Sequence, residues 1–262
     1  MISFLSALWA ETLKARRSKV PLFTAIGFSI APMVGGLFMI ILKDPVAARS
    51  MGLISTKAQL TAGTAEWSTL FNMLAQATAI GGGIVFAIFT VWIFGREFSD
   101  HTAKELLALP TTREAIVGAK FIVIVFWTLF LTLLGYVLGL IIGKLVVIPG
   151  WSDELFRSST VDILGSGLLS ILLLPFVAFF ASAGKGYLPS FGWIVLSVVM
   201  AQIAAITGWG DWFPWSIPAL FSGAVGPRAE FLGLHSYVII VITSLTGLAI
   251  TFYWWRSADH TR

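Results

Sequence analysis

The sequence contains no cysteine and carries little charge. None of its 262 residues is Cys, and only 11% are Asp, Glu, Lys or Arg. The absence of cysteine excludes disulfides, thiolate catalysis and metal sites with cysteine ligands. An ordinary soluble domain has about 25% charged residues, so the low charge argues against a water-soluble fold.

Apolar residues make up 57% of the chain and gather in six long runs. Each run is close to the roughly 20 residues that a helix needs to cross about 30 Å of hydrocarbon. Strands of a membrane barrel would instead alternate over about ten residues between turns. We therefore predict an all-α integral membrane protein, with one transmembrane domain over residues 1–262 and spans at 20–42, 70–95, 116–143, 162–183, 189–209 and 235–256.

Two segments outside the spans also have apolar faces. Within residues 1–19, Leu5 and Trp9 lie one helical turn apart and Glu11 lies elsewhere on the helical wheel. This pattern predicts an amphipathic helix that lies on the membrane surface. Residues 210–234 are rich in Trp and Pro, and we expect a short re-entrant or interfacial element there, at the outer end.

Glycine and proline within the spans predict features of the packing. Gly135, Gly139 and Gly143 repeat every four residues, a spacing that lets helices approach closely in lipid. Pro175 removes a backbone hydrogen bond, so we expect a kink in the fourth span.

The distribution of Lys and Arg predicts the orientation. If the N-terminus is inside, eleven of these residues lie in inner segments and six in outer loops. Inner loops of membrane proteins carry an excess of Lys and Arg. Both termini are therefore predicted to be cytoplasmic, and an even number of spans agrees with this.

The segment at residues 96–115, between the second and third spans, is predicted to form a helix, a break and a second helix. Thr102 with Glu105 fits a capping box, in which the two side chains satisfy free backbone amides at a helix start. Thr111 with Glu114 offers a second capping box, and the proline between the two boxes ends the first helix.

This loop is predicted to have an apolar surface that is surrounded by charged side chains of both signs. Leu106 and Leu107 give the short helix an apolar surface, and acidic and basic side chains surround it. Such a mixture is typical of a protein-docking patch, whereas nucleic-acid binding would favour positive charge alone. The alternative is a solvated helix that packs on its own bundle.

The same run resembles the signature of ABC-2 type permeases between their second and third spans, loosely E-x-x-x-x-T-x-K-x-L-L-x-x-P-x-x-R. The residues that carry the resemblance are Glu97, Asp100, Thr102, Lys104, Leu106, Leu107, Pro110, Arg113 and Lys120. One departure is His101, where family members often have a small residue such as Gly. Within the family, the chain is most similar to permeases associated with bacitracin and lantibiotic export or immunity.

The resemblance implies a coupling helix that is seated in a groove of a separate ATPase subunit. Two permeases, as a homodimer or heterodimer, and two ATPases would form the working unit. The implied ATPase-coupling residues are Glu97, Asp100, His101, Thr102, Lys104, Glu105, Leu106, Leu107, Pro110 and Arg113. The implied seam between permeases is lined by the second and fifth spans, with Phe71, Met73, Phe86, Phe89, Val198, Met200 and Ile203 on a cargo pathway that suits an apolar or amphipathic molecule.

The chain lacks the motif that cradles ATP. The pairs Gly143-Lys144 and Gly184-Lys185 have neither the preceding glycine nor the following Ser or Thr of a P-loop. We therefore expect no cofactor on this chain, and ATP with Mg²⁺ on the partner ATPase.

A membrane-embedded enzyme and a channel or carrier that does not use ATP are the alternatives. A carrier or proton relay would place ionisable groups inside the bundle, and the apolar runs contain essentially none. An enzyme would need converging acid, base or metal-binding groups. His101, His235 and His260 are predicted in the inner loop, at the outer edge and in the tail, so they would not share a site.

Overall fold

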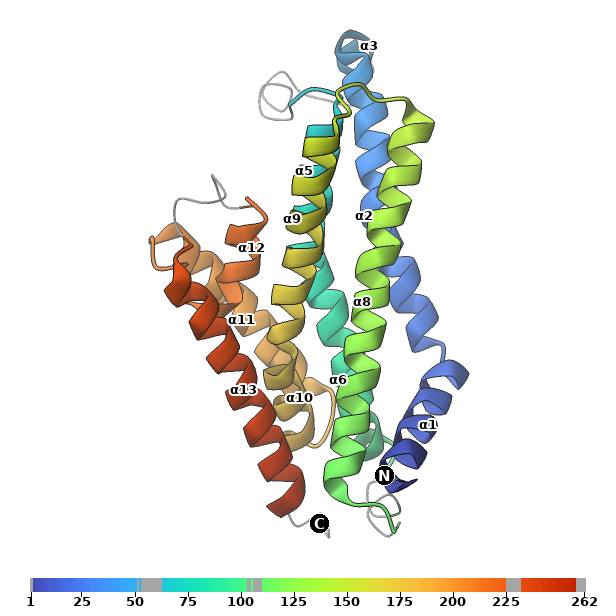
Figure 1. The fold of residues 1–262 in the computed structure, drawn as a ribbon, viewed down its shortest axis with the longest axis vertical. Coiled ribbons are helices and arrows are strands. Elements are labelled where there is room, and N and C mark those ends of the chain that lie inside the picture. Colours follow the sequence, from blue (N-terminus) through green and yellow to red (C-terminus); the bar gives the residue numbers. More distant parts are fainter. Residues whose placement is uncertain are drawn as a thin grey trace.

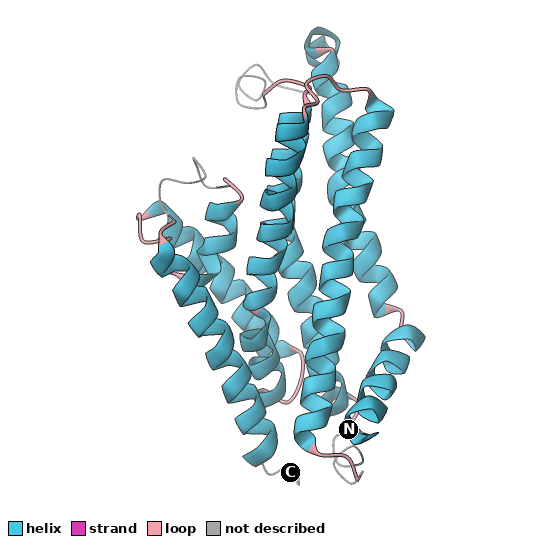
Figure 2. Cartoon of the chain, viewed as in Figure 1, coloured by secondary structure: helices cyan, strands magenta, loops and turns pink. Residues whose placement is uncertain are grey.

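A computed structural model of the protein describes residues 2–50, 52, 63–102, 105, 110–224 and 232–257. Within these ranges every regular element is a helix and no strand occurs (Figure 2). Six helical segments are long and apolar enough to cross a membrane. They are Val20–Lys43, Trp67–Ser99, Arg113–Val146, Asp153–Ala183, Leu188–Ile206 and Leu234–Ser257. The all-α class and the six predicted spans are confirmed.

The helices stand side by side as a bundle (Figure 1). The helix α8 (Arg113–Val146) packs against α2 (Val20–Lys43) along much of its length. On the other side, α10 (Leu174–Ala183) packs against α13 (Leu234–Ser257), and α11 (Leu188–Ile206) packs against α10. The start of α1, the end of α6, the start of α8 and the end of α13 lie at one end of the bundle, which we call the loop end.

The second span is interrupted near its middle. It consists of α5 (Trp67–Ala77), a π-helical turn η1 (Thr78–Gly82) and α6 (Gly83–Ser99). The hydroxyl of Ser170 on α9 (Asp153–Leu172) donates to the Ala79 carbonyl at 3.3 Å, within this turn. A π-turn adds a residue to the helix without breaking it and is frequent at functional sites.

The fourth span breaks where proline predicts a kink. The helix α9 ends at Leu172, and α10 starts at Leu174 with Pro175 in its first turn. Proline has no N–H to donate, and it is well tolerated at a helix start. The chain therefore forms two shorter helices in place of one continuous span.

The three regularly spaced glycines of α8 face other helices closely, as predicted. A Cβ atom at Gly135 would overlap the Phe28 ring, and a Cβ atom at Gly139 would overlap Leu74. A Cβ atom at Gly143 would overlap Trp67 in the same way. These glycines allow α2 and α5 to lie against α8.

The predicted amphipathic helix is α1 (Ile2–Arg17), which packs against the loop end of α8. Leu5 and Trp9 are 58% and 68% exposed, so an apolar face points away from the bundle. Glu11 lies on a different face, as the helical wheel indicates, but this face is buried against the bundle between the turns of Ala7 and Ala15. Small neighbours one turn away on each side let this carboxylate reach the interior.

The outer element forms two short helices in the described part of residues 210–234. These are the 3-10 turn η2 (Pro214–Ser216) and α12 (Ile217–Phe221), which lies beside α9. The Ser216 hydroxyl donates to the Gly210 carbonyl at 2.6 Å and fixes the turn between α11 and η2. Residues 225–231 lie outside the described part of the chain.

Candidate functional site

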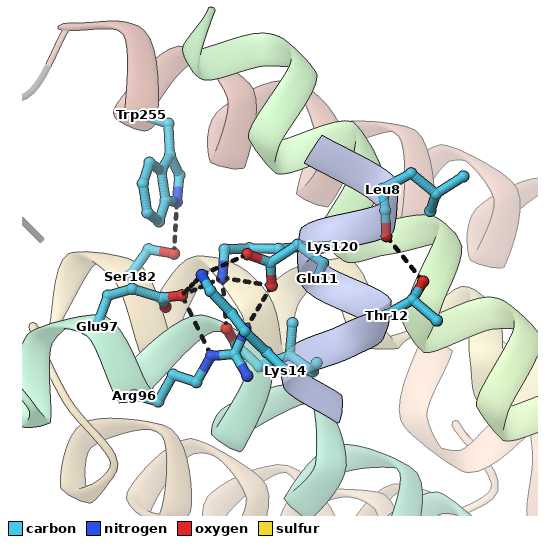
Figure 3. Close-up of polar contacts among 10 residues, drawn as sticks. Leu8, Glu11, Thr12, Lys14, Arg96, Glu97, Lys120, Ser182 and Trp255 are labelled. Atoms are coloured by element: carbon cyan, nitrogen blue, oxygen red, sulfur yellow. Dashed lines mark hydrogen bonds and ion pairs between the residues drawn. The ribbon is translucent and has the colours of Figure 1, made fainter. Parts of the chain in front are cut away.

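Four buried charged side chains meet at the loop end of the bundle (Figure 3). Glu11 comes from α1, Arg96 and Glu97 from the last turns of α6, and Lys120 from the third turn of α8. Their residues are between 0% and 7% exposed. We call these four residues the charge cluster, and it joins three helices that flank the loop at residues 96–115.

Each acid of the charge cluster is paired with both cations. The Arg96 Nη2 atom lies 2.5 Å from Glu11 Oε2, and Arg96 Nε lies 3.2 Å from Glu97 Oε1. The Lys120 Nζ atom lies 3.2 Å from Glu11 Oε2 and 2.8 Å from Glu97 Oε1. Lys14, on the rim, adds contacts of 2.8 Å to Glu11 and 3.3 Å to Glu97. Buried charges persist only with such partners.

The network fixes relative positions more than it adds net stability. Taking ions out of water costs several kcal/mol each, and the ion pairs roughly offset that cost. Removing one partner, in contrast, leaves a buried charge uncompensated and typically costs about 3–5 kcal/mol. Lys120 also donates to the Ile93 carbonyl at 2.8 Å, which ties α8 to the backbone of α6.

The pKa of Glu11 reports the balance of these effects. Burial by itself would raise this pKa, but the positive charges of Lys120 and Arg96 outweigh burial and hold the pKa below its usual value. Glu11 is therefore ionised at neutral pH and can form its ion pairs with Arg96 and Lys120.

One atom of the charge cluster has no partner. The Glu97 Oε2 atom is buried and accepts no hydrogen bond from the described residues. A buried carboxylate oxygen without a donor costs free energy.

Within the predicted coupling loop, the helix α6 is ended by a residue with a left-handed backbone. His101 has φ 57°, its N–H donates to the Phe98 carbonyl at 3.3 Å, and the Thr102 N–H donates to the Glu97 carbonyl at 2.9 Å. These two bonds form a Schellman motif, which ends helices most often with glycine at this position. Glycine adopts this backbone most readily, which gives a physical reason for the small residue expected at position 101 in place of His101.

The N-cap of the helix after the loop is one residue later than the capping box predicts. Thr112, and not Thr111, is the N-cap of α8, and its hydroxyl accepts from the Ala115 N–H at 3.3 Å. The third helical position is then Ala115, whose methyl side chain cannot accept the hydrogen bond that completes a capping box. Glu114 instead lies in the first turn, where a negative charge complements the helix dipole. Two adjacent threonines made the register ambiguous in the sequence.

Arg113 connects the end of the loop to the last span. Its Nη1 atom donates to the Trp255 carbonyl at 3.1 Å and to the Arg256 carbonyl at 3.3 Å. These carbonyls belong to the last turn of α13, where a cation satisfies free acceptors and complements the dipole. Trp255 in turn donates from Nε1 to the Ser182 hydroxyl at 2.9 Å, so α10 joins the same assembly.

The predicted ATPase-coupling residues therefore divide into two groups. Glu97 is buried, and Arg113 is half-buried against α13. The side chains that remain open to solvent are those of Asp100, His101, Thr102, Glu105 and Pro110. Lys104, Leu106 and Leu107, together with most of the predicted helix at about 103–109, lie outside the described residues.

The predicted cargo-pathway residues do not share one surface of this subunit. Three of them are buried in the core, namely Phe71, Phe86 and Phe89. Met73 and Val198 are half-buried, and only Met200 and Ile203 are largely exposed.

A small apolar cavity of about 100 Å³ lies between α6 and α11, the helices that carry several of the predicted cargo-pathway residues. Its walls come from η1, α6, α10, α11 and α12, and they include Ile84, Val177, Val198 and Pro218. Of the predicted cargo-pathway residues, Val198 lines it. The cavity depends on the π-turn and on the outer element, and neither feature can be placed from hydropathy.

Sequence reasoning missed Glu11 and Lys120. Glu11 was placed only on a face of the surface helix away from Leu5 and Trp9, and Lys120 was named within the signature-like run without a buried position or a partner. The signal for Glu11 was its position between Ala7 and Ala15, each one turn away, which marks a narrow face that can pack closely. The signature-like run includes Lys120, but it does not identify the partners of this side chain, because they come from α1 and α6.

The fold and this site define a permease of the ABC transporter class. Residues 7–203 match the ABC-2 family transporter protein family, so the chain belongs to it. Among curated proteins, the chain is similar to the bacitracin transport permease protein BCRB of Bacillus licheniformis. The two are 25% identical over 179 residues, which cover 67% of this chain and 84% of the relative. The chain is thus a multi-pass membrane protein and a transporter permease.

Proposed function

We propose that this permease is the membrane-spanning subunit of an ATP-driven exporter in the cytoplasmic membrane of a bacterium. A separate ATPase subunit, which carries ATP and Mg²⁺, would dock on the loop at residues 96–115. The observation that carries this proposal is the charge cluster. It holds together the helices on both sides of the loop, and it fits a device that transmits movement from a docked partner.

The cluster suggests how such a movement would spread. A push on the loop would act on α6 through Glu97 and on α8 through Lys120, because the two side chains are paired at 2.8 Å. Glu11 would carry the movement to α1, and Arg113 would carry it to α13. The loop end would then move as a unit, which coupling to a rigid ATPase requires.

The proposed orientation places the loop end in the cytoplasm. Both termini and the loop lie at this end, and Lys14, Arg16 and Arg17 occupy the last turn of α1 there. An excess of basic residues is typical of the cytoplasmic side. This orientation puts the loop in the compartment that contains ATP.

The cargo is proposed to be apolar or amphipathic. The helix α11 exposes Val199, Met200 and Ile203, a face that a second permease subunit would cover in a homodimer or heterodimer. The cavity beside α11 is also lined mainly by apolar side chains. The relative's name refers to bacitracin, so antibiotics are the first cargo to test, with lipids and hydrophobic drugs next.

Docking of the ATPase can be tested by copurification. The permease would be co-expressed with a P-loop ATPase encoded beside it, extracted in detergent and isolated through a tag on the permease. We expect the double variant Leu106→Asp/Leu107→Asp to lose the ATPase while it remains in the membrane. The matched control is Leu145→Asp, which changes a 76% exposed leucine at the far end of α8. Retention of the ATPase by the loop variant would contradict the proposed docking site.

A further inference from the structure

Besides the apolar cavity beside α11, the structure has a cleft at the loop end. This cleft lies next to the charge cluster, between α1 and α6. Its volume is about 450 Å³, and its lining includes Lys14, Arg17 and Ser18 from the end of α1 and the turn that follows. Trp92 and Asp100 line it on the side of α6. The cleft shares Glu97, Asp100 and Thr102 with the proposed coupling loop, but that proposal gives no role to Arg17 or Ser18.

The surroundings of the cleft place it at the membrane surface. Ser18 lies two residues before Val20, where the first span begins. On α1, Trp9 points away from the bundle and is 68% exposed. Tryptophan side chains and basic residues favour the headgroup region. A ligand in the cleft would therefore be at the depth of phospholipid headgroups.

Hydrogen-bond donors are available in the cleft on the side of α1. Arg17 is exposed, and no ion pair of its guanidinium occurs within the described residues. Lys14 Nζ contacts two carboxylates and has three N–H donors, so one can serve another acceptor. The Ser18 hydroxyl accepts from the Val20 N–H at 3.1 Å, and its own proton is left to donate.

The charges in the cleft favour an anion near α1. The cleft has three cations, Lys14, Arg17 and Arg96, and two acids, Glu97 and Asp100. Glu97 is already paired with cations of the charge cluster. Asp100 is then the acid that would oppose an anion.

We propose that this cleft binds the phosphate of an anionic phospholipid headgroup through Lys14, Arg17 and Ser18. Three donors on one short stretch of chain match the several acceptor oxygens of a phosphate group. The first turns of α2, directly after this stretch, expose Leu22, Phe23 and Ile26, and these side chains offer a surface for the acyl chains. A bound lipid would hold α1 at the membrane surface and against the bundle. The proposal does not depend on the identity of the cargo, and its lipid-binding donors Lys14, Arg17 and Ser18 lie outside the loop at residues 96–115.

The test compares two adjacent arginines. Full-length protein would be freed of lipid in detergent and titrated with phosphatidylglycerol, with bound lipid counted by native mass spectrometry. Arg17→Gln should weaken binding by about fivefold, the effect of one basic residue near a charged surface. Arg16→Gln removes the same charge from a neighbouring exposed position that does not line the cleft, and it should change binding by less than about twofold. Equal losses in both variants would overturn the proposal.

Two further measurements cover misfolding and the source of the phosphate. Asp100→Asn removes the opposing acid and should strengthen binding of phosphatidylglycerol, a gain that misfolding would not produce. A loss of binding in this variant would count against the assigned charges. Millimolar inorganic phosphate should leave the lipid bound. If it displaces the lipid, the occupant is a soluble phosphate and the assignment to a lipid is wrong.

Discussion

The Lys120 ammonium of α8 lies 2.8 Å from the Glu97 carboxylate of α6, and both side chains are almost completely shielded from solvent. The two residues are 23 positions apart, and the connection between them is the predicted coupling loop. A buried ion pair that closes a loop at its base fixes the distance between the loop's two ends. Predictions about stability and transport follow from this relationship.

Removal of Lys120 alone should destabilise the protein strongly. Lys120→Met leaves Glu11 and Glu97 with fewer partners in a buried site, and we expect a loss of about 3–5 kcal/mol. The measurement is the thermal midpoint in detergent, followed by size-exclusion chromatography. Lys120→Met with Glu97→Gln should recover part of the loss, because a neutral amide needs no counter-charge. Lys19→Met, at an exposed position before α2, is the control and should have little effect.

Acid should weaken the charge cluster through Glu11. Its folded-state pKa is lowered from the ordinary value of 4.5, so ionised Glu11 contributes stability that is fully present above pH 4.5. This stability is lost as the pH falls through the lowered pKa. The difference in thermal midpoint between wild type and Glu11→Gln should therefore be constant from about pH 7 to pH 5 and shrink below about pH 4.5. A difference that disappears already near pH 6 would contradict the ion pairs assigned to Glu11.

Glycine at position 101 should stabilise the protein. His101 has φ 57°, and a left-handed conformation costs a residue with a side chain roughly 1–2 kcal/mol relative to its usual backbone. His101→Gly should therefore raise stability by about 1 kcal/mol, visible as a higher thermal midpoint. Asp100→Gly, one residue earlier with φ −89°, is the matched control and should not raise it. A lower midpoint for His101→Gly would show that the imidazole makes a stabilising contact.

Close packing at the glycines of α8 gives a prediction with a clear contrast. Gly139→Ala places a methyl group into Leu74, and overpacking of this kind typically costs about 1–3 kcal/mol. Gly27→Ala on α2 is the control, because no atom lies within 4 Å of a Cβ at that position. The control should be neutral or slightly stabilising, since alanine favours a helix. Equal midpoints for the two variants would argue against the packing of α5 on α8.

The sequence predicted the features that depend on composition and local spacing. The length of the apolar runs was enough for six spans, and the spacing of Gly135, Gly139 and Gly143 was enough for a close helix approach. It did not predict the π-turn at Thr78–Gly82, because an added residue in a helix leaves the hydropathy unchanged. Hydropathy alone also does not show where the helices begin and end. Arg113 and Lys120 precede the uncharged run that starts at Phe121, and both lie inside α8, as the helix start near Thr111 predicts.

The candidate site was predicted only where its residues are close in sequence. The run from Glu97 to Arg113 carried a recognisable spacing, and the structure places Glu97 in the charge cluster. Glu11 and Lys120 join Glu97 from positions 86 and 23 residues away, as the residue numbers show. Pairings of this kind depend on how the helices pack against one another. A short segment of sequence contains no information about that packing. The N-cap of α8 is a smaller example, because the local sequence could not decide between Thr111 and Thr112.

Loss of the Glu97 carboxylate should separate transport from folding. In Glu97→Ala, Arg96 still reaches Glu11, so α1 stays attached to α6, but the contact across the base of the loop is lost. We expect ATP-dependent transport to fall much more than the amount of protein in the membrane. Both would be measured in the same cells, with expression from a tag and transport as resistance to, or efflux of, the antibiotic tested. Co-expressed ATPase should still bind, because Glu97 is buried and the exposed side chains of the loop are unchanged. Full transport by this variant would make Glu97 a carboxylate that only stabilises the helix end.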